Sequence, residues 1–214
     1  MNKQYLRRPL ALACLVVALC SAQTASAESE IKWFVEAAPA IARVSATVNL
    51  GGGVSAKDSM TFDGGSLAAG FVIDNTHRLQ LEIGRLTNTI TTYHTGGSFI
   101  EKLTENYTIV PVLVTYNYLY QLSEKVSAGV GATLGVMNVG YEVEYVSPYA
   151  FYRESDSAIS LAAGLNAITQ VQFTESFYMN VAIRYLFVGN SKFNSVTFEK
   201  NKTLLATLGF GWKF

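Results

Sequence analysis

The last twelve residues of the chain, from Thr203 to Phe214, alternate between apolar and small or polar side chains. The opposite phase contains a single leucine, and every second position is apolar: Leu204, Ala206, Leu208, Phe210, Trp212 and Phe214. Successive side chains of a β-strand point to opposite faces, so this pattern predicts a strand with one face toward an apolar environment.

The first 27 residues have the features of a secretory signal peptide. Lys3, Arg7 and Arg8 precede an apolar run over residues 10–22, and residues 25–27 (Ala-Ser-Ala) match the small-x-small pattern of signal peptidase sites. The run is shorter than the roughly 20 residues that a spanning helix needs. We therefore expect cleavage after Ala27 and one mature domain over residues 28–214.

Both cysteines, Cys14 and Cys20, lie in this leader, so the mature chain has no thiol, disulfide or cysteine metal ligand. We also predict no cofactor and no metal site. Leu19 stands before Cys20, where a lipobox has Gly or Ala, which disfavours a lipoprotein. Without the three leader cations, 13 Lys and Arg face 16 Asp and Glu, a net charge of −3. This balance gives no indication of nucleic-acid binding.

Seven further alternating stretches bring the number of predicted strands to eight, and the fold class to all-β. Short turns near residues 75, 124 and 175 alternate with long loops near 57, 97, 151 and 195, the first of them holding Gly51–Gly53 and Asp63–Gly64. A change of apolar phase after Val136 predicts a bulge near Asn138. The predicted strands cover about residues 32–50, 66–74, 79–84, 110–120, 126–143, 159–167, 177–187 and 203–214.

Alternation alone leaves two architectures open: a soluble barrel with its apolar face inside, and a membrane barrel with that face outside. Three features favour the membrane barrel. The opposite phase is rich in Gly, Ala, Ser, Thr and Asn, which suits a narrow lumen, and charged residues make up only 15% of the chain. Short turns alternate with long loops. Aromatic residues fall at two levels, as in the girdles of transmembrane barrels: Trp33, Phe71, Tyr118, Tyr120, Phe173, Phe177, Trp212 and Phe214 near the short turns, and Tyr107, Tyr141, Tyr185 and Phe187 further up.

Lipid offers no hydrogen-bond partners, so the last strand must close onto the first. Pro39 and Pro111 each remove one backbone donor from the ladder, and we expect them at bulges or at the membrane rim. The continuation from Thr87 to Thr92 has strand propensity without a clean apolar face, and we expect it to rise out of the bilayer.

The eight stretches and the ending Phe210-Gly211-Trp212-Lys213-Phe214 resemble the small eight-stranded outer-membrane barrels, the OmpX-like and OmpA-like family. The resemblance implies an antiparallel transmembrane up-and-down β-barrel in the bacterial outer membrane, with both termini in the periplasm. It also implies contact with outer-membrane lipid and lipopolysaccharide. The outer-membrane assembly machinery is an implied partner that recognises Phe210, Trp212 and Phe214. Functions in this family are diverse, so the fold does not assign one.

Polar residues of the lumen phase are expected to turn inward and pair, because a cation facing lipid at mid-bilayer costs about 2–4 kcal/mol. A structural plug is one interpretation of this set, and a polar pathway for water or small ions is the other. The set comprises Glu36, Glu82, Asn117, Asn166, Gln170, Arg184 and Lys213.

Arg85 falls on the lipid phase near the outer rim, where it either reaches lipopolysaccharide phosphates or turns inside through a phase slip at Gly84. The Thr87–Thr92 ridge could recruit a partner strand. The long loop near residue 151 is a candidate contact surface for an extracellular protein, because it holds side chains enriched at interfaces: Tyr145, Tyr149, Phe151, Tyr152 and Arg153.

A lipid A deacylase would need a serine and a histidine base together near the outer rim. The two histidines are His77, in a predicted turn, and His94, with Ser98 the nearest serine in its loop. We therefore expect no catalysis. The sequence predicts an outer-membrane barrel with a structural or surface-interaction role, with a narrow porin-like channel as the alternative and a lipid A-modifying enzyme third.

Overall fold

The computed structural model describes residues 30–49, 55–96, 99–193 and 196–214. Within these ranges all regular structure is β. The predicted signal peptide and Gly51–Gly53 lie outside the described residues. The strands are β1 (Ile31–Asn49), β2 (Ser55–Ile73), β3 (His77–Gly96), β4 (Phe99–Gln121), β5 (Val126–Val146), β6 (Phe151–Gln172), β7 (Phe177–Val188), β8 (Ser191–Phe193) and β9 (Val196–Lys213).

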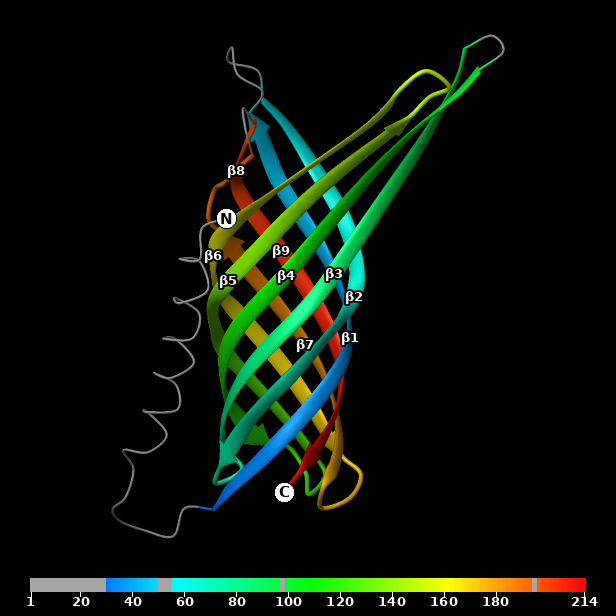
Figure 1. The fold of residues 1–214 in the computed structure, drawn as a ribbon. Coiled ribbons are helices and arrows are strands. Elements are labelled where there is room, and N and C mark those ends of the chain that lie inside the picture. The colour runs from blue at the N-terminus through cyan, green and yellow to red at the C-terminus, as the bar shows by residue number, and fades with distance from the viewer. Residues whose placement is uncertain (1–29, 50–54, 97–98, 194–195) are drawn as a thin grey trace, which may run out of the picture.

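Eight of these strands close into an antiparallel ring (Figure 1). β1 to β7 pair in sequence order, β7 pairs with β9, and β9 pairs back with β1, while the three-residue β8 pairs only with β9. At the seam, Trp33 N–H donates to Phe214 O at 3.0 Å and Phe214 N–H donates to Trp33 O at 2.9 Å. The predicted eight-stranded up-and-down barrel is confirmed.

The three predicted short turns are also confirmed, at one end of the barrel. In the first, Asp74 and Asn75 have positive φ angles of 51° and 55°, and Thr76 N–H donates to Ile73 O at 3.0 Å. Positive φ values at two successive central residues of a turn from Ile73 to Thr76 are the signature of the type I′ turn, which Asp and Asn tolerate better than most residues. His77, predicted in this turn, is the first residue of β3.

Several strands are longer than predicted at the opposite end. Asp63 and Gly64 lie inside β2, paired with Ile41 and Ala40, so the loop expected there is wrong. β4 begins at Phe99 rather than near residue 110, and β6 begins at Phe151. The loop predicted near residue 151 is reduced to residues 147–150.

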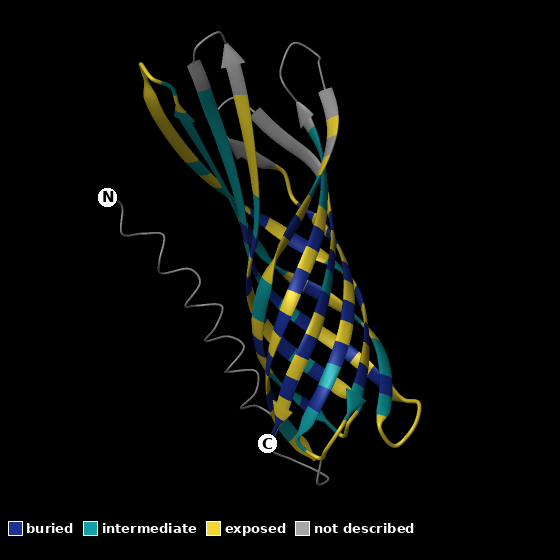
Figure 2. Ribbon diagram, turned by 90° about the vertical axis from the view of Figure 1, so that its right-hand side faces the viewer, coloured by how far each residue is buried: buried dark blue, intermediate teal, exposed yellow. Residues whose placement is uncertain are grey.

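Exposure alternates along the barrel strands, as the chequered colouring in Figure 2 shows. The apolar phase faces outward: Leu161 is 75% exposed, Val181 45% and Leu208 37%. On β1 this phase runs from Ile31 to Ile41 and is followed by the exposed Arg43. Ten steps of about 3.3 Å, tilted by about 40°, span about 25 Å, the height of the apolar band of a transmembrane barrel.

The bulge predicted near Asn138 is wrong. Asn138 pairs with Val110 and with Ile159, and the register of β5 does not shift on either side. Beyond Asn138, the inward-facing side chains of β5 are apolar and the outward-facing ones are mostly not. Val139 faces inward and packs against the apolar cluster inside the barrel. The backbone is continuous, and what changes is which face of the strand carries the apolar side chains.

The same reversal corrects the upper aromatic girdle. Tyr107 and Tyr141 lie on the inner phase, with ring centroids 5.0 Å apart, and Tyr107 packs against the interior cluster. Tyr141 donates to Glu105 at 3.1 Å, and burial together with this bond raises the pKa of Tyr141. Tyr185 and Phe187 are exposed on the outer phase as expected.

Neither proline lies at a bulge. Pairing of β1 with β9 is interrupted between Ala37 and Ala40, and the register on both sides of Pro39 is the same. Pairing of β3 with β4 is interrupted around Pro111 in the same way. The register shift in β1 occurs instead between Ser45 and Thr47.

Candidate functional site

The lower half of the lumen is organised around the ion pair between Glu36 and Arg78. Arg78 Nη2 donates to Glu36 Oε2 at 2.6 Å, and neither side chain is exposed by more than 5%. The same oxygen accepts from Tyr178 Oη at 3.0 Å and from Asn180 Nδ2 at 2.5 Å. The guanidinium carbon of Arg78 lies 4.1 Å from the centre of the Phe34 ring, so its open face is also covered.

A second buried ion pair lies further up the bore. Arg184 donates to both oxygens of Glu82, at 3.0 Å and 2.7 Å. Gln80 links the two pairs, because its Oε1 accepts from Arg78 Nε at 3.0 Å and its Nε2 donates to Glu82 at 3.1 Å. Gln170 accepts from Arg78 Nη1 at 3.0 Å. We call these linked residues the lumen network: Glu36, Arg78, Gln80, Glu82, Gln170, Tyr178, Asn180 and Arg184.

All seven residues predicted for the lumen are buried, but they do not form one cluster. Glu36, Glu82, Gln170 and Arg184 belong to the lumen network. Asn166 donates to Asn117 in a separate contact across β4 and β6. Lys213 donates to Gln172 at 2.9 Å near the turn end.

Arg78, Gln80, Tyr178 and Asn180 were missed as lumen residues. Arg78 lies two positions before Gln80 and four before Glu82, so the same alternation would have placed it inside had the strand been started at His77. Tyr178 needs space that only glycine opposite it provides: a Cβ on Gly211 would lie 2.1 Å from the Tyr178 ring, and one on Gly209 would lie 2.3 Å from Glu36 Oε1.

An apolar layer fills the bore above the lumen network. On each strand, the residues of this layer lie further from the short turns than the polar residues of the lower lumen. Leu113 is further from the short turns than Thr115, Leu186 is further than Arg184, and Leu205 is further than Thr207. The layer consists of Ala40, Ala42, Phe62, Leu86, Ile109, Leu113, Met137, Ala162, Leu186, Val188 and Leu205.

The turn end of the bore is open instead. A cavity of about 920 Å³ lies there, lined among others by Lys32, Gln170, Gln172 and Lys213. Gln170, a member of the lumen network, is among its lining residues, together with the buried apolar side chains of Val72 and Leu119.

Four strands continue beyond the barrel and lean away from its axis (Figure 1). β2 stops pairing with β3 at Thr87, and β7 starts pairing with β6 only at Ala162, so β3 to β6 form a separate sheet above these points. We call this part the protruding sheet, residues 87–96, 99–108, 140–146 and 151–157. It confirms the prediction that Thr87–Thr92 continues as strand above the apolar band.

The residues predicted as a contact loop lie at the tip of this sheet, mostly within strands. Tyr145 is in β5, Tyr149 is in the connection and is 80% exposed, and Phe151, Tyr152 and Arg153 are exposed on β6. Arg153 pairs with Glu142 at 2.9 Å, a bond that raises the pKa of Arg153. Their role in binding stays a prediction.

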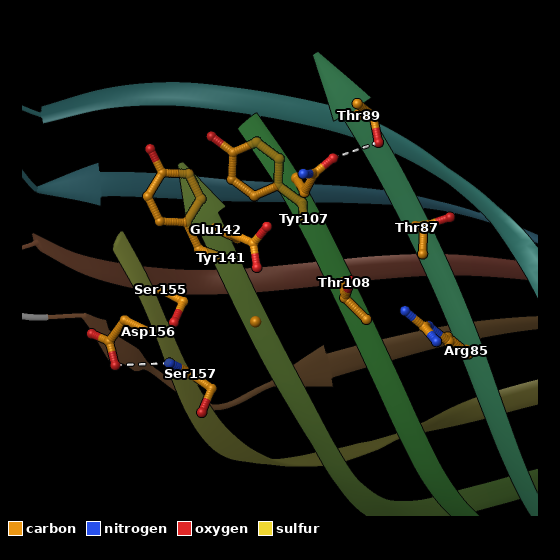
Figure 3. A pocket seen from close by; sticks show the side chains of 12 residues that line it. Arg85, Thr87, Thr89, Tyr107, Thr108, Tyr141, Glu142, Ser155, Asp156 and Ser157 are labelled. Atoms are coloured by element: carbon orange, nitrogen blue, oxygen red, sulfur yellow. Dashed lines mark hydrogen bonds between the residues drawn. The ribbon is translucent and has the colours of Figure 1, made fainter. Parts of the chain in front are cut away.

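A polar cavity of about 640 Å³ lies at the base of the protruding sheet, across all four strands (Figure 3). Arg85 lines it and is exposed, and the register of β2 with β3 is continuous from Asp63 to Ile73, so the phase slip considered at Gly84 does not occur. We call this cavity the polar hollow; it is lined by Arg85, Thr87, Thr89, Asn106, Tyr107, Thr108, Gly140, Tyr141, Glu142, Ser155, Asp156 and Ser157.

His77 contacts Tyr116, with 2.7 Å between His77 Nδ1 and Tyr116 Oη, and belongs to the aromatic belt near the turns. The side chain of His94 is outside the described part of the structure. Within the described ranges, no group of three or more His, Cys, Asp or Glu residues could hold a metal ion. No helix among the described residues is long and apolar enough to span a bilayer.

No protein-family model and no curated protein sequence matches the chain. Solved structures do. The crystal structure of Neisserial surface protein A is 17% identical, with a TM-score of 0.51, covering 85% of this chain and 97% of that one. OprG of Pseudomonas aeruginosa is 12% identical, with a TM-score of 0.52, covering 87% and 97%. Ail of Yersinia pestis, solved with the heparin analogue sucrose octasulfate, is 19% identical with a TM-score of 0.45, covering 84% and 99%. The chain has the fold of the small eight-stranded outer-membrane β-barrels.

Proposed function

We propose that the protein is an integral barrel of the bacterial outer membrane that contacts a partner outside the cell through its protruding sheet. The observation that carries this proposal is the sheet itself, four strands that extend past the apolar band and end in exposed aromatic side chains. Exposed Tyr and Phe side chains supply large contact areas at low entropic cost, and loops and tips held by a rigid scaffold commonly bind partners.

The interior supports a barrel that does not conduct. An ion entering from the turn end would meet two buried ion pairs and then an apolar layer that offers no polar ligand. Eight strands leave a bore that side chains nearly fill. The narrow channel remains the alternative, and planar-bilayer recordings test it: reproducible single-channel steps that disappear in Arg184→Gln would favour the channel.

The orientation and the lipid partners follow from the same proposal. The short turns, and with them both chain ends, face the periplasm, while the assembly machinery recognises the outward-facing Phe210, Trp212 and Phe214. Catalysis is not part of the proposed function. Incubation of the folded barrel with lipid A, followed by mass spectrometry of the lipid, tests this, and loss or transfer of an acyl chain would contradict it.

The contact role is tested with a triple variant, Tyr149→Ser, Phe151→Ser and Tyr152→Ser. Intact cells that carry equal surface amounts of the wild-type or the variant protein are compared for attachment to host-cell and matrix-coated surfaces. The matched control is Tyr93→Ser, an exposed tyrosine on the other hairpin of the same sheet. We expect the triple variant to lose attachment and the control to keep it; equal attachment of wild type and triple variant would contradict the proposal.

A further inference from the structure

The two faces of the protruding sheet differ in charge. Side chains in phase with the lumen residues of β3 to β6 form what we call the inner face, and the alternate side chains form the outer face. Arg153 on the outer face pairs with Glu142 at 2.9 Å and lies opposite Glu144 on the neighbouring strand. With Lys102, the outer face therefore has two cations and two carboxylates, and its charge is balanced.

The inner face carries negative charge without a matching cation on the sheet. Its positions within the protruding sheet hold no lysine or arginine, and they hold four carboxylates: Glu101, Glu105, Glu154 and Asp156. Glu105 and Glu154 lie in one row on either side of Val143, so two strand spacings, or about 10 Å, separate them. We call Glu105, Val143 and Glu154 the acidic row. A face of one charge sign attracts ligands of the opposite sign.

The acidic row lies between two rows of tyrosines. Tyr107 and Tyr141 form the row below it, with ring centroids 5.0 Å apart. Tyr145 and Tyr152 form the row above it, toward the tip of the sheet. Tyrosine rings attract cations to their faces, and a guanidinium group can stack on a ring while it binds a carboxylate. The inner face thus offers both kinds of group that a cation binds, in adjacent rows.

Hydrogen bonds from two of these tyrosines position the carboxylates of the acidic row. Tyr141 donates to Glu105 at 3.1 Å, and Tyr152 donates to Glu154. Burial raises the pKa of Tyr141 most, and the bond to Glu105 and the nearby negative charge, including that of Glu154, raise it further. Tyr141 is therefore protonated at neutral pH. A neutral hydroxyl group does not cancel the charge of the carboxylate that it binds.

The inner face is covered at its base and open toward its tip. At the base, Tyr107 packs against the apolar cluster inside the barrel. Further up, Glu105 and Tyr145 are half-buried, and Tyr152 and Glu154 are exposed. The sheet leans away from the barrel axis (Figure 1). A ligand can therefore reach the acidic row from the tip without entering the bore.

We propose that the inner face of the protruding sheet binds an extended protein segment rich in arginine and lysine. A protein segment fits because Glu154 and Asp156 are two positions apart on one strand, about 6.6 Å, which is also the spacing of residues i and i+2 on one side of an extended chain. Each cation would pair with a carboxylate and lie against a tyrosine ring. This inference rests on the proposed function, because it names the chemical class of the partner that the protruding sheet contacts.

The test measures the affinity of a fluorescent peptide of four Arg-Ser repeats for the full barrel in phosphatidylcholine nanodiscs, by fluorescence anisotropy. A peptide of four Gln-Ser repeats is the neutral probe of equal length. The double variant Glu105→Gln with Glu154→Gln removes two charges from the inner face. The matched control, Glu142→Gln with Glu144→Gln, removes the same two charges from the outer face. Tyr141→Leu removes a ring that Tyr141→Phe keeps.

We expect the wild-type barrel to bind the Arg-Ser peptide and not the Gln-Ser peptide, with an affinity that falls as salt rises. The inner-face double variant should weaken binding about tenfold, the loss expected for two exposed ion pairs, and the outer-face control should bind as wild type. Tyr141→Leu should weaken binding about threefold and Tyr141→Phe should not. Equal binding of the two peptides would overturn the inference. Equal weakening by the two double variants would also overturn it, by reducing the effect to net charge.

Glu154→Gln alone is the second variant should the double variant fail to fold, because Glu154 is exposed on a strand that has no further neighbour at this level. Wild-type affinity of this single variant would overturn the inference. Failure of the proposed function gives a different result. If the tip variant loses attachment while the wild-type barrel binds no Arg-Ser peptide, the contact role stands and the cationic partner is rejected. If nanodiscs bind the peptide but intact cells carrying the barrel do not, the location of the sheet outside the cell is contradicted instead.

Discussion

Removing the negative charge of Glu36 should destabilise the barrel more than any comparable change on its surface. In Glu36→Gln, Arg78 stays buried with no opposite charge, since its other hydrogen-bond acceptors are the neutral Gln80 and Gln170. Breaking a buried ion pair in this way costs about 3–5 kcal/mol. We expect the free energy of unfolding to fall by that amount.

The double variant Glu36→Gln with Arg78→Met should recover part of this loss, because it removes the uncompensated cation and leaves an apolar side chain against Phe34. The coupling free energy between the two positions should be about 3 kcal/mol. Glu30→Gln serves as the control, since Glu30 pairs with Lys32 at 3.0 Å in an exposed position where such pairs contribute about 0–1 kcal/mol.

The assay is denaturant unfolding from phospholipid vesicles, followed by tryptophan fluorescence. The two tryptophans of the chain, Trp33 and Trp212, are exposed on the outer wall near the turns, so unfolding transfers both from lipid to water. A loss below about 1 kcal/mol for Glu36→Gln, or strict additivity with Arg78→Met, would show that the pair behaves like a surface ion pair and would refute the reasoning.

Three further outcomes are expected. Gly211→Ala should destabilise the same unfolding transition by about 1–3 kcal/mol, because its Cβ would lie 2.1 Å from the Tyr178 ring, while Gly140→Ala, with open space, should leave the midpoint unchanged. Leu161→Arg should make insertion into vesicles less favourable by about 2–4 kcal/mol, because it places a cation on the lipid-facing wall. An unchanged free energy of insertion would contradict the outward orientation. Planar-bilayer recordings of the refolded wild-type barrel should show no discrete conductance steps, given the apolar layer across the bore.

The barrel and the inward position of its polar residues could be predicted because both follow from the alternation of side chains between the two faces of each strand. Glu82 and Arg184 are on lumen-facing phases whatever the register. Their pairing could not be predicted, since they are 102 residues apart and meet only through the registers of all the strands between them. The lumen position of Arg78 was not predicted for a local reason. Asp74 and Asn75 indicated a turn, and the predicted turn was extended through His77, so the predicted strand began after Arg78.

The strand ends beyond the exposed apolar band were predicted poorly because the criterion used, an apolar outer face, applies only within that band. Residues 99–108 of β4 and 151–157 of β6 are paired as regularly as the rest, yet the side chains on their outer side are mostly polar. A long polar stretch between two apolar strands of a membrane barrel can therefore be either a loop or a continued hairpin, and alternation of the inner phase is the feature that separates them.

The continuous register at Asn138 is required by the interior. A true bulge there would move every later residue of β5 to the opposite face. Val139 would then lose its packing against the apolar layer, and Tyr141 would lose both its contact with Tyr107 and its hydrogen bond to Glu105. The reversal of the apolar pattern after Val136 is thus how one uninterrupted strand packs first against lipid and then, on its other face, against the core of the barrel. Under the proposed outer-membrane location, the position of the reversal would mark the outer boundary of the membrane on each strand where it occurs.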